Sequence, residues 1–537
     1  MLPVFFALVL ALAPGALAGS AFASSDDAVL RMGVGARRLS ARIVERPLAF
    51  PEGVVRGPSP PTPFEHSAGY FALNRTSAAE MFYFLFRSRA PASDSSPVVL
   101  WMTGGPGCSS EIALFGENGP YVVNADAATL RVSEFGWDAV SNLVYVDQPI
   151  GTGFSYSTDP ADDVHDEKRV ADDMLQFLSE FADAHPEFAG RDFFVTGESY
   201  AGHYVPAVAY RVFREQQLGN GPTFTLRGLA IGNGLTMPEI QYGAYADYAL
   251  GMDLVSEEAA SNARALVPEC QAKIARCGGS AGPVGPAGES AKKRALCTDA
   301  VAFCQQIPGM LLDAAGDVNV YDVRKPCVVP GLCYDFSAVA SFLNLPSTRA
   351  ALGVARPETP SWRSCDDKVH ADMMADWMRD LEPVIPPMLE AGVRVMVYAG
   401  EDDFICNWVG NRRWVRAMPW SGAAAFVATR AEPFVVDGVT GGEVIEADAL
   451  AFVKMSQSGH MVPMDQPKNA LAMLDRFVRG APIAGEPWTG RGCCGSGFGC
   501  EGGDEAGRKN VKSPRVDAII NLGGKTTSSE PRRAAPR

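Results

Sequence analysis

Ser199 is the side chain whose type and surroundings best suit a nucleophile. It lies in the run GESYAG (197–202), after an apolar stretch at 193–195 and before a helical pattern. A serine between two glycines, on a tight turn between a buried strand and a helix, is the G-x-S-x-G pattern of a nucleophile elbow. In this chain Ala201 stands between Tyr200 and the second glycine, Gly202. Glycines flank such a turn because side chains would crowd it. A chance match in an ordinary turn is the alternative.

A serine nucleophile needs a base and an acid, and residues of both kinds occur later in the chain. His460 follows one predicted strand, and three carboxylates, Glu401, Asp402 and Asp403, follow another. The order of serine, acid and histidine, each after a strand, is that of α/β hydrolases. His460 would take the proton of Ser199 and return it to the leaving group, while a carboxylate fixes the histidine tautomer. The residues alone do not distinguish among the three carboxylates.

A glycine pair follows the predicted strand at 98–102, in the sequence TGGPGCSS (103–110). Glycines directly after a strand free backbone N–H groups to point at an anion. Taken alone, this pair is most simply an ordinary turn. Opposite a nucleophile elbow, it would form half of an oxyanion hole.

The hydrophobic pattern alternates between buried strands and amphipathic helices, which is the rhythm of a doubly wound sheet. A partly alternating pattern at 69–88 predicts antiparallel strands at one edge of that sheet. Apolar runs predict strands at 98–102, 142–147, 193–195, 226–231, 393–398 and 450–455, and apolar faces predict helices at 169–184 and 469–478.

Composition indicates a globular protein and argues against a nucleic-acid partner. The chain has 537 residues, of which 47% are hydrophobic and 20% charged, and its net charge is −15. A negative charge of this size is unfavourable for binding a phosphate backbone. It is compatible with an acidic compartment, where part of it would be neutralised.

The N-terminus and the cysteines both indicate secretion. An apolar run at 5–13 followed by small residues resembles a signal peptide. Pro14 breaks this run before the about 18 apolar residues that a membrane span needs, and we expect no span later in the chain. The 12 cysteines occur partly in close pairs, which predicts disulfides in an oxidising compartment. Zinc is the alternative, but only 6 histidines and no CxxC pair are present, so no metal site is expected. Asn74 begins an N-glycosylation sequon.

The changes of pattern along the chain predict its organisation. A central stretch of helical segments, interrupted by paired cysteines, is expected to be a cap inserted into the sheet domain. The predicted parts are a signal peptide at 1–23, a propeptide or surface arm at 24–65, core at 66–235, the cap at 236–344, core at 345–487 and a disordered tail at 488–537.

Five long motifs, in this order, resemble the serine carboxypeptidase family, of the carboxypeptidase Y-like kind within the α/β-hydrolase superfamily. The similarity extends from about residue 69 to 480. It implies an α/β fold with a mostly parallel central sheet, helices on both faces and an inserted disulfide-rich helical cap. The motifs are WMTGGPGCSS (101–110), DQPIGTGFSY (147–156), GESYAGHYVP (197–206), DFICNW (403–408) and GHMVP (459–463).

The resemblance also implies roles for residues that the patterns leave open. Asp403 becomes the acid of the triad with Ser199 and His460, and the N–H groups of Gly105 and Tyr200 form the oxyanion hole.

By the same resemblance, Glu117 and Glu198 share a proton and hold the carboxylate of the substrate, together with Thr103 and Gly104. Two adjacent carboxyl groups cannot both ionise cheaply, so at acidic pH the pair can donate to a carboxylate. Thr103 departs from the family pattern, which has asparagine there. A hydroxyl lacks the second donor of an amide, and this predicts weaker carboxylate binding or altered substrate choice.

Further expectations from the resemblance concern the substrate pocket and the cysteines. Trp377, Ile405, Cys406 and Met461 would line the pocket together with Tyr200, with ordinary core packing as the alternative for each. Cys406 would stay reduced, so that mercurials inhibit. The implied disulfides are Cys108–Cys365, Cys270–Cys304, Cys277–Cys297 and Cys327–Cys333.

The sequence therefore predicts a serine-type carboxypeptidase that releases C-terminal amino acids through an acyl-enzyme, favoured at acidic pH and without a cofactor. Its substrates would be the C-termini of peptides or proteins, and a homodimer is compatible with this reading. The expected location is the secretory pathway, ending in a vacuole or lysosome or outside the cell. Two alternatives remain: an acyltransferase that uses a sugar ester, and a protein that protects another enzyme without catalysis.

Overall fold

A computed structural model describes residues 43–56, 66–74, 78–90, 95–278, 291–329 and 331–485. The predicted signal peptide at 1–23, most of the segment at 24–65 and the predicted tail at 488–537 with its three cysteines lie outside these residues.

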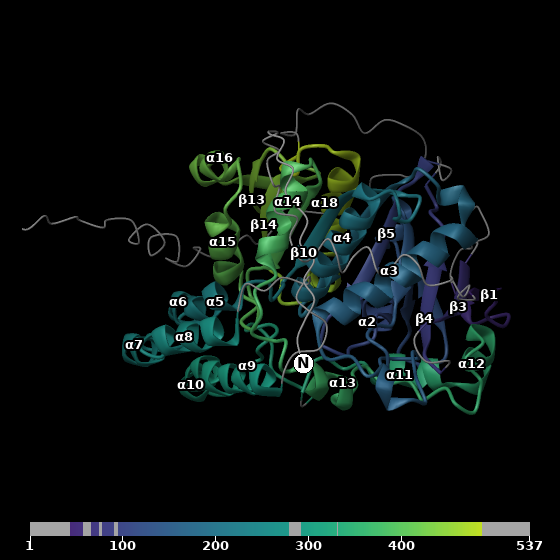
Figure 1. The fold of residues 1–537 in the computed structure, drawn as a ribbon, viewed down its shortest axis with the longest axis horizontal. Coiled ribbons are helices and arrows are strands. Elements are labelled where there is room, and N and C mark those ends of the chain that lie inside the picture. Colours follow the sequence, from purple (N-terminus) through teal and green to yellow (C-terminus); the bar gives the residue numbers. More distant parts are fainter. Residues whose placement is uncertain are drawn as a thin grey trace, which may run out of the picture. The chain divides into compact units, whose positions relative to one another are not determined.

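The described chain is organised around an 11-stranded sheet, and the strands predicted from apolar runs form its centre (Figure 1). Six strands, β8, β5, β9, β10, β11 and β14, are parallel, and antiparallel strands flank them at both ends. This confirms the mostly parallel central sheet. In spatial order the strands are β1 (Ile43–Pro47), β3 (His66–Ala72), β4 (Glu80–Phe86), β8 (Asn142–Val146), β5 (Val98–Thr103), β9 (Asp192–Glu198), β10 (Thr225–Gly232), β11 (Arg394–Gly400), β14 (Leu450–Met455), β13 (Val439–Ala447) and β12 (Glu432–Val436).

The central strands read as continuous apolar runs because helices cover both faces of the sheet. Successive residues of a strand point to opposite faces. In β9, a side chain at Gly197 would contact Val205 of α4 (Ala201–Gln217). Phe194 points the other way, and its ring lies 5.5 Å from that of Phe477 in α18 (Pro467–Arg479). The predicted helix at 169–184 is α3 (Glu167–Ala184), which packs beside α4.

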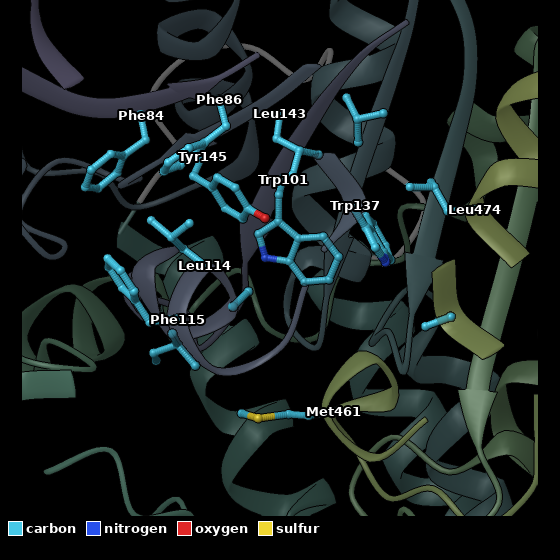
Figure 2. Packing of buried hydrophobic residues seen from close by; sticks show 14 of the residues in the cluster. Phe84, Phe86, Trp101, Leu114, Phe115, Trp137, Leu143, Tyr145, Met461 and Leu474 are labelled. Carbon is cyan, nitrogen blue, oxygen red and sulfur yellow. The ribbon is translucent and has the colours of Figure 1, made fainter. Parts of the chain in front are cut away.

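A large apolar cluster in the described chain contains aromatic side chains from β4, β5 and β8 (Figure 2). Trp101 meets Trp137 edge to face at 5.2 Å, and Phe86 meets Tyr145 at 6.0 Å. Such pairs add about 0.5–1.5 kcal/mol each to the stabilisation from burial alone. The cluster packs against β5, the strand that leads into the glycine pair at 104–105.

Between β10 and β11 the described chain contains helices and no strand. Two disulfides, Cys270–Cys304 and Cys277–Cys297, join α8 to α9 in this region, as expected for a disulfide-rich insertion. The limits 236 and 344 remain predictions. The helices are α5 (Pro238–Gln241), α6 (Tyr245–Gly251), α7 (Glu257–Arg264), α8 (Val267–Cys277), α9 (Ala291–Cys304), α10 (Gln306–Ala315), α11 (Ser337–Asn344), α12 (Pro346–Leu352), α13 (Asp367–Met373) and α14 (Ile385–Glu390).

One helical stretch within the described ranges, Ala291–Ala315, is long and apolar enough to cross a bilayer by length and composition. This differs from the expectation that no later segment reaches that length. The stretch comprises α9 and α10, and its cysteines form disulfides with α8. Core helices of proteins without a membrane span meet the same criterion, so the stretch by itself is weak evidence for one.

Two features of the strands differ from the sequence expectations. No strand was predicted before residue 65, yet the described part of that segment contains β1, which pairs with β3, and β2 (Val55–Arg56), which pairs with β7 (Leu130–Val132) in a separate three-stranded sheet. The hairpin of β12 and β13 was not predicted. Its turn residues Asp437 and Gly438 have φ values of 49° and 77°. The Asp-Gly pair is a signal for this tight turn that could have revealed the hairpin.

Candidate active site

Ser199 occupies the turn between β9 and α4, as the elbow pattern predicts. Its φ is 67°, a left-handed conformation that costs a residue with a side chain of order 1–3 kcal/mol. Backbone hydrogen bonds hold it there: the Ser199 amide donates to the Gly232 carbonyl at 3.0 Å, and the Ser199 carbonyl accepts from the amides of Gly202 and Leu235 at 2.9 and 3.0 Å. The side chain is partly exposed between buried neighbours.

The glycines on both sides of the elbow are required by neighbouring backbone. A Cβ atom at Gly197 would lie 2.3 Å from the carbonyl oxygen of Met102 in β5. One at Gly202 would lie 2.5 Å from the carbonyl oxygen of Leu235. The glycines thus permit the elbow to pack between β5 and the chain that leaves β10.

Asp403 and His460 lie at the carboxyl ends of the adjacent parallel strands β11 and β14, and they contact each other. His460 Nδ1 is 2.9 Å from Asp403 Oδ2, and the two residues are 2% and 0% exposed. This hydrogen bond orients the imidazole and leaves Nε2 as the nitrogen that can accept a proton. The other two carboxylates turn elsewhere: Glu401 lies 3.5 Å from Lys454 and Asp402 lies 3.2 Å from Arg324.

Asn233 is a site residue that the sequence patterns missed. It directly follows β10, the neighbour of β11, and its Nδ2 donates to Asp403 Oδ2 at 2.8 Å. Its Oδ1 accepts from the Gly400 amide at 3.2 Å. Backbone amides of Ile405 and Cys406 also donate to Asp403, at 3.1 and 3.2 Å. The only available signal was the position of an asparagine at the end of a neighbouring strand.

The loop after β5 lies directly against the elbow. A Cβ atom at Gly104 would be 2.3 Å from the Tyr200 amide nitrogen, so only glycine fits. In the part of the chain that the structure describes, neither the Gly105 amide nor the Tyr200 amide donates to a backbone carbonyl. The Cys108–Cys365 disulfide and a bond from the Cys108 amide to the Gly104 carbonyl, at 3.1 Å, hold this loop. Two unused N–H groups on adjoining segments are suited to an oxyanion.

Glu117 and Glu198 form a buried pair beside the elbow. Glu117 follows α2 (Glu111–Gly116), Glu198 ends β9, and they are 8% and 2% exposed. Burial raises the pKa of Glu198 well above its ordinary value, and the Glu117 carboxyl raises it further. Burial likewise raises the pKa of Glu117, although a hydrogen bond with Glu198 lowers it in part. Among the described residues no donor reaches either carboxyl oxygen of Glu117 when both groups are ionised. A shared proton therefore suits the pair.

Thr103 is buried at the end of β5, where its hydroxyl already has one partner. Its Oγ1 accepts from the Trp101 indole Nε1–H at 3.0 Å, and its amide donates to Ser110 Oγ at 3.2 Å. Because a hydroxyl both accepts and donates, the single hydroxyl hydrogen of Thr103 remains available.

The residues predicted for the substrate pocket occupy different environments. The Trp377 ring lies 5.3 Å from that of Tyr200, and its Nε1–H donates to the Tyr242 hydroxyl at 3.0 Å. Ile405 is partly exposed, and its carbonyl accepts from the Tyr245 hydroxyl at 2.6 Å.

The other two predicted pocket residues are buried. Met461 is 6% exposed within the large apolar cluster (Figure 2), which keeps the core alternative open for it. Cys406 is a free buried cysteine, and burial together with the negative charges of Asp403 and Glu198 raises its pKa. The pocket assignment stays a prediction for all four residues.

The structure contains the four disulfides that the resemblance implied, Cys108–Cys365, Cys270–Cys304, Cys277–Cys297 and Cys327–Cys333. Asn74 is exposed, while the other two residues of its sequon lie outside the described residues. Glycosylation there stays a prediction.

Comparisons with known proteins agree with this architecture. A family model described as serine carboxypeptidase matches residues 57–480. The chain is 49% identical to serine carboxypeptidase-like 48 of Arabidopsis thaliana over 443 residues, which cover 82% of this chain and 84% of that protein. It is 48% identical to serine carboxypeptidase 3 of Oryza sativa subsp. japonica over 415 residues, covering 77% and 79%. A prohormone-processing carboxypeptidase of Saccharomyces cerevisiae has a similar fold, with a TM-score of 0.68, 24% identity and coverage of 78% and 92%.

Proposed function

Because this chain belongs to the serine carboxypeptidase family, a family of peptide hydrolases, we propose that it removes amino acids from peptide C-termini through an acyl-enzyme on Ser199. The observation that carries the exopeptidase part is the buried pair of Glu117 and Glu198, because Glu198 directly precedes the nucleophile. A recognition group for a chain end is useful only beside the reacting serine.

Acylation uses Ser199 as the nucleophile and His460 as the base and then the acid, while Asp403 orients the imidazole. The Ser199 oxygen attacks the carbonyl carbon of the last peptide bond while His460 takes the hydroxyl proton. The N–H groups of Gly105 and Tyr200 bind the oxyanion of the tetrahedral intermediate. The C–N bond then breaks, and His460 gives its proton to the departing amine. A water molecule, deprotonated by His460, hydrolyses the ester and restores Ser199. The hydrogen bond between Asp403 and His460 supports this assignment.

Recognition of the chain end follows from the carboxyl pair. With one proton between them, Glu117 and Glu198 can donate a hydrogen bond to the terminal carboxylate, together with the Gly104 amide and the Thr103 hydroxyl. When both groups ionise, they repel that carboxylate. Because burial raises the pKa of both groups, binding is expected to weaken as pH rises, which favours activity at acidic pH.

The same chemistry indicates where the protein works. Four disulfides in the described chain support an oxidising compartment, and the predicted signal peptide supports entry into the secretory pathway. An acidic optimum would favour a vacuole or lysosome over the cell exterior.

Mass spectrometry of a peptide digested at pH 5 and at pH 7.5 tests the proposal. We expect stepwise shortening from the C-terminus, faster at pH 5, that is abolished by a serine-directed organophosphate and by Ser199→Ala. Internal cleavage would refute exopeptidase action, and activity in Ser199→Ala would refute the nucleophile. A glucose ester offered with an acceptor alcohol tests the acyltransferase alternative, since transfer without release of amino acids would favour it.

A further inference from the structure

A segment at 319–325, after α10, lies against both loops that carry the acid and the base. The Val320 carbonyl accepts from the amides of Phe404 and Ile405 at 3.1 and 3.0 Å. The next carbonyl, that of Tyr321, accepts from the His460 amide at 2.7 Å. One short segment therefore contacts the residues directly after Asp403 on one side and His460 itself on the other.

The packing of this segment against the histidine loop leaves no spare room. A Cβ atom at Gly459 would lie 2.4 Å from the Tyr321 carbonyl oxygen and 2.7 Å from the Asp322 Cβ. A shift of the segment would therefore move the residue that directly precedes His460.

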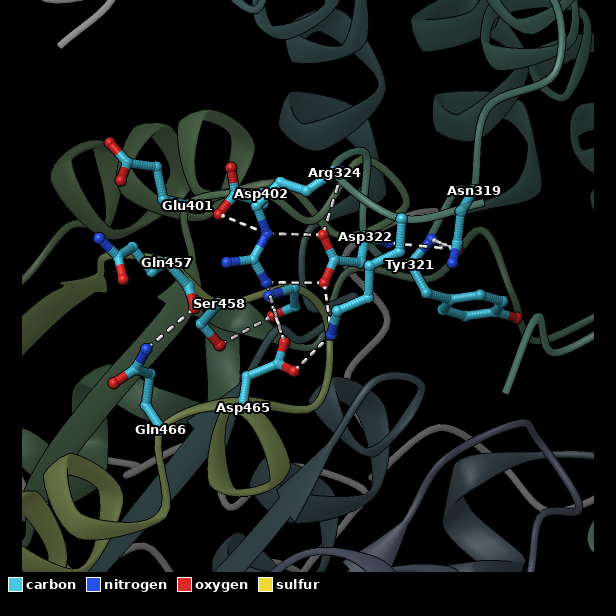
Figure 3. Close-up of polar contacts among 12 residues, drawn as sticks. Asn319, Tyr321, Asp322, Arg324, Glu401, Asp402, Gln457, Ser458, Asp465 and Gln466 are labelled. Carbon is cyan, nitrogen blue, oxygen red and sulfur yellow. Dashed lines mark hydrogen bonds and ion pairs between the residues drawn. The ribbon is translucent and has the colours of Figure 1, made fainter. Parts of the chain in front are cut away.

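The side chain of Arg324 joins the two loops through three carboxylates (Figure 3). Its Nε and Nη2 bind the two oxygens of Asp322 at 2.8 and 2.7 Å. Nε also lies 3.2 Å from Asp402 Oδ2, and Nη2 lies 3.4 Å from Asp465 Oδ2. Lys325 completes the cluster with contacts to Asp322 at 2.9 Å and Asp465 at 2.7 Å.

Two of these carboxylates are built into the triad loops. Asp402 directly precedes Asp403, and its amide donates to the Ser458 carbonyl at 2.8 Å. Asp465 Oδ2 accepts from the Gly459 amide at 2.8 Å. Arg324 thus contacts Asp402, the residue before the proposed acid. It also contacts Asp465, whose carboxylate binds the amide of the residue before His460.

The charge of Arg324 matters because its partners are buried. The side chains of Asp322, Asp402 and Asp465 are 0%, 11% and 9% exposed. Burial raises the pKa of Asp402 to about 6 even with Arg324 opposing the rise. For Asp322, the hydrogen bonds from Arg324 and Lys325 outweigh the effect of burial and lower the pKa. Without the guanidinium, Lys325 would be the remaining cation of this cluster, and through Asp322 and Asp465 it would offset only part of the repulsion among the three buried carboxylates. An isolated surface ion pair contributes little, but this guanidinium links several buried groups.

We propose that Arg324 is a positioning residue that holds the Asp403 loop and the His460 loop at the spacing their hydrogen bond requires. The proposal rests on the proposed role of Ser199, Asp403 and His460. It places part of the control of triad geometry in a segment of the predicted cap, far in sequence from both loops.

The test is the rate at which Ser199 reacts with diisopropyl fluorophosphate, because this reaction needs the aligned base but no chain-end recognition. For Arg324→Met we expect a rate constant and a kcat about tenfold to a hundredfold below wild type, since a displacement of ~1 Å costs about 10²-fold. The total label at completion should still reach one per chain, which shows that the protein is folded. The KM for a blocked dipeptide should change less than kcat, and Arg324→Lys should restore part of the rate.

Arg264→Met is the matched control. The Arg264 side chain is 33% exposed, against 34% for Arg324, and it binds Asp247 and Glu257 at 2.8 and 2.7 Å within the helical insertion. This variant should react at the wild-type rate. Rates within twofold of wild type for Arg324→Met would overturn the proposal, as would equal losses in both variants. If Arg324→Met does not fold, Asp402→Ala replaces it, and we expect a smaller decrease in the rate constant. An unchanged rate constant in Asp402→Ala would overturn the proposal. Absence of label on Ser199 in the wild type would instead refute the proposed function.

Discussion

Replacement of Glu117 by glutamine is expected to remove the pH dependence of substrate binding. In the proposed state one proton is shared between Glu117 and Glu198, so that the pair carries one negative charge; burial raises the pKa of both groups. Glu117→Gln also leaves one negative charge, on Glu198, and supplies an amide N–H that donates at every pH. The variant therefore imitates the singly protonated pair permanently.

The size of the effect follows from the hydrogen bond at stake. A hydrogen bond to a charged group contributes about 1.5–3 kcal/mol. Since 1.36 kcal/mol is about a factor of ten, full loss of the shared proton should raise the wild-type KM about tenfold to about 150-fold, and the rise should set in as pH approaches about 8, the pKa to which burial raises Glu117. The KM of Glu117→Gln should stay near the wild-type value at pH 5 and remain level up to pH 8.

The assay compares a blocked dipeptide with its C-terminal methyl ester at a series of pH values. The ester has no terminal carboxylate, so its KM should not follow the pair in either protein. Glu382→Gln is the control variant, because Glu382 is also a buried carboxyl group with a pKa that burial raises, to about 7, but it lies in η7 (Glu382–Val384) outside the candidate site. Its KM should rise with pH as in the wild type. A KM for Glu117→Gln that rises as steeply as the wild-type KM would refute the reasoning.

Three further outcomes are expected. Burial raises the pKa of Asp147, Glu167 and Asp376, which therefore keep protons in the fold that the unfolded chain releases above about pH 4. The unfolding free energy should thus fall as pH rises, and calorimetry should give a lower Tm at pH 8 than at pH 5; an equal or higher Tm would contradict this. Asn233→Ala removes a donor to the triad acid and should lower kcat/KM about tenfold to about 150-fold, from a loss of about 1.5–3 kcal/mol, whereas unchanged kinetics would exclude that role. Gly202→Ala places a methyl group 2.5 Å from a carbonyl oxygen and should destabilise the protein by about 1–3 kcal/mol in urea unfolding, so an unaltered midpoint would show that the loop yields freely.

The elements that carry the candidate site were predictable because their signals are local. Buried parallel strands read as short apolar runs, and the turn at Ser199 is marked by its glycines within six residues. The order of serine, acid and histidine along the chain was therefore visible without a structure. The β12–β13 hairpin was predictable on the same grounds, since its Asp-Gly turn is also a local signal.

The choice among three neighbouring carboxylates could not be made from residue types. Glu401, Asp402 and Asp403 are chemically alike and consecutive, so pattern reasoning left all three open until the family resemblance selected one. In the fold each side chain leaves the loop in a different direction, and Asp403 alone of the three contacts His460.

Contacts between distant segments were decided by tertiary structure alone. Asn233 reaches Asp403 across 170 residues of sequence because β10 and β11 are adjacent strands in the sheet. Arg324 meets Asp402 and Asp465 because a helical insertion returns past the ends of β11 and β14. Periodicity and turn chemistry describe each segment by itself, whereas the order of strands in the sheet determines which segment ends converge. The sequence could therefore name the proposed reacting groups, and only the folded chain could supply the residues that hold them in place.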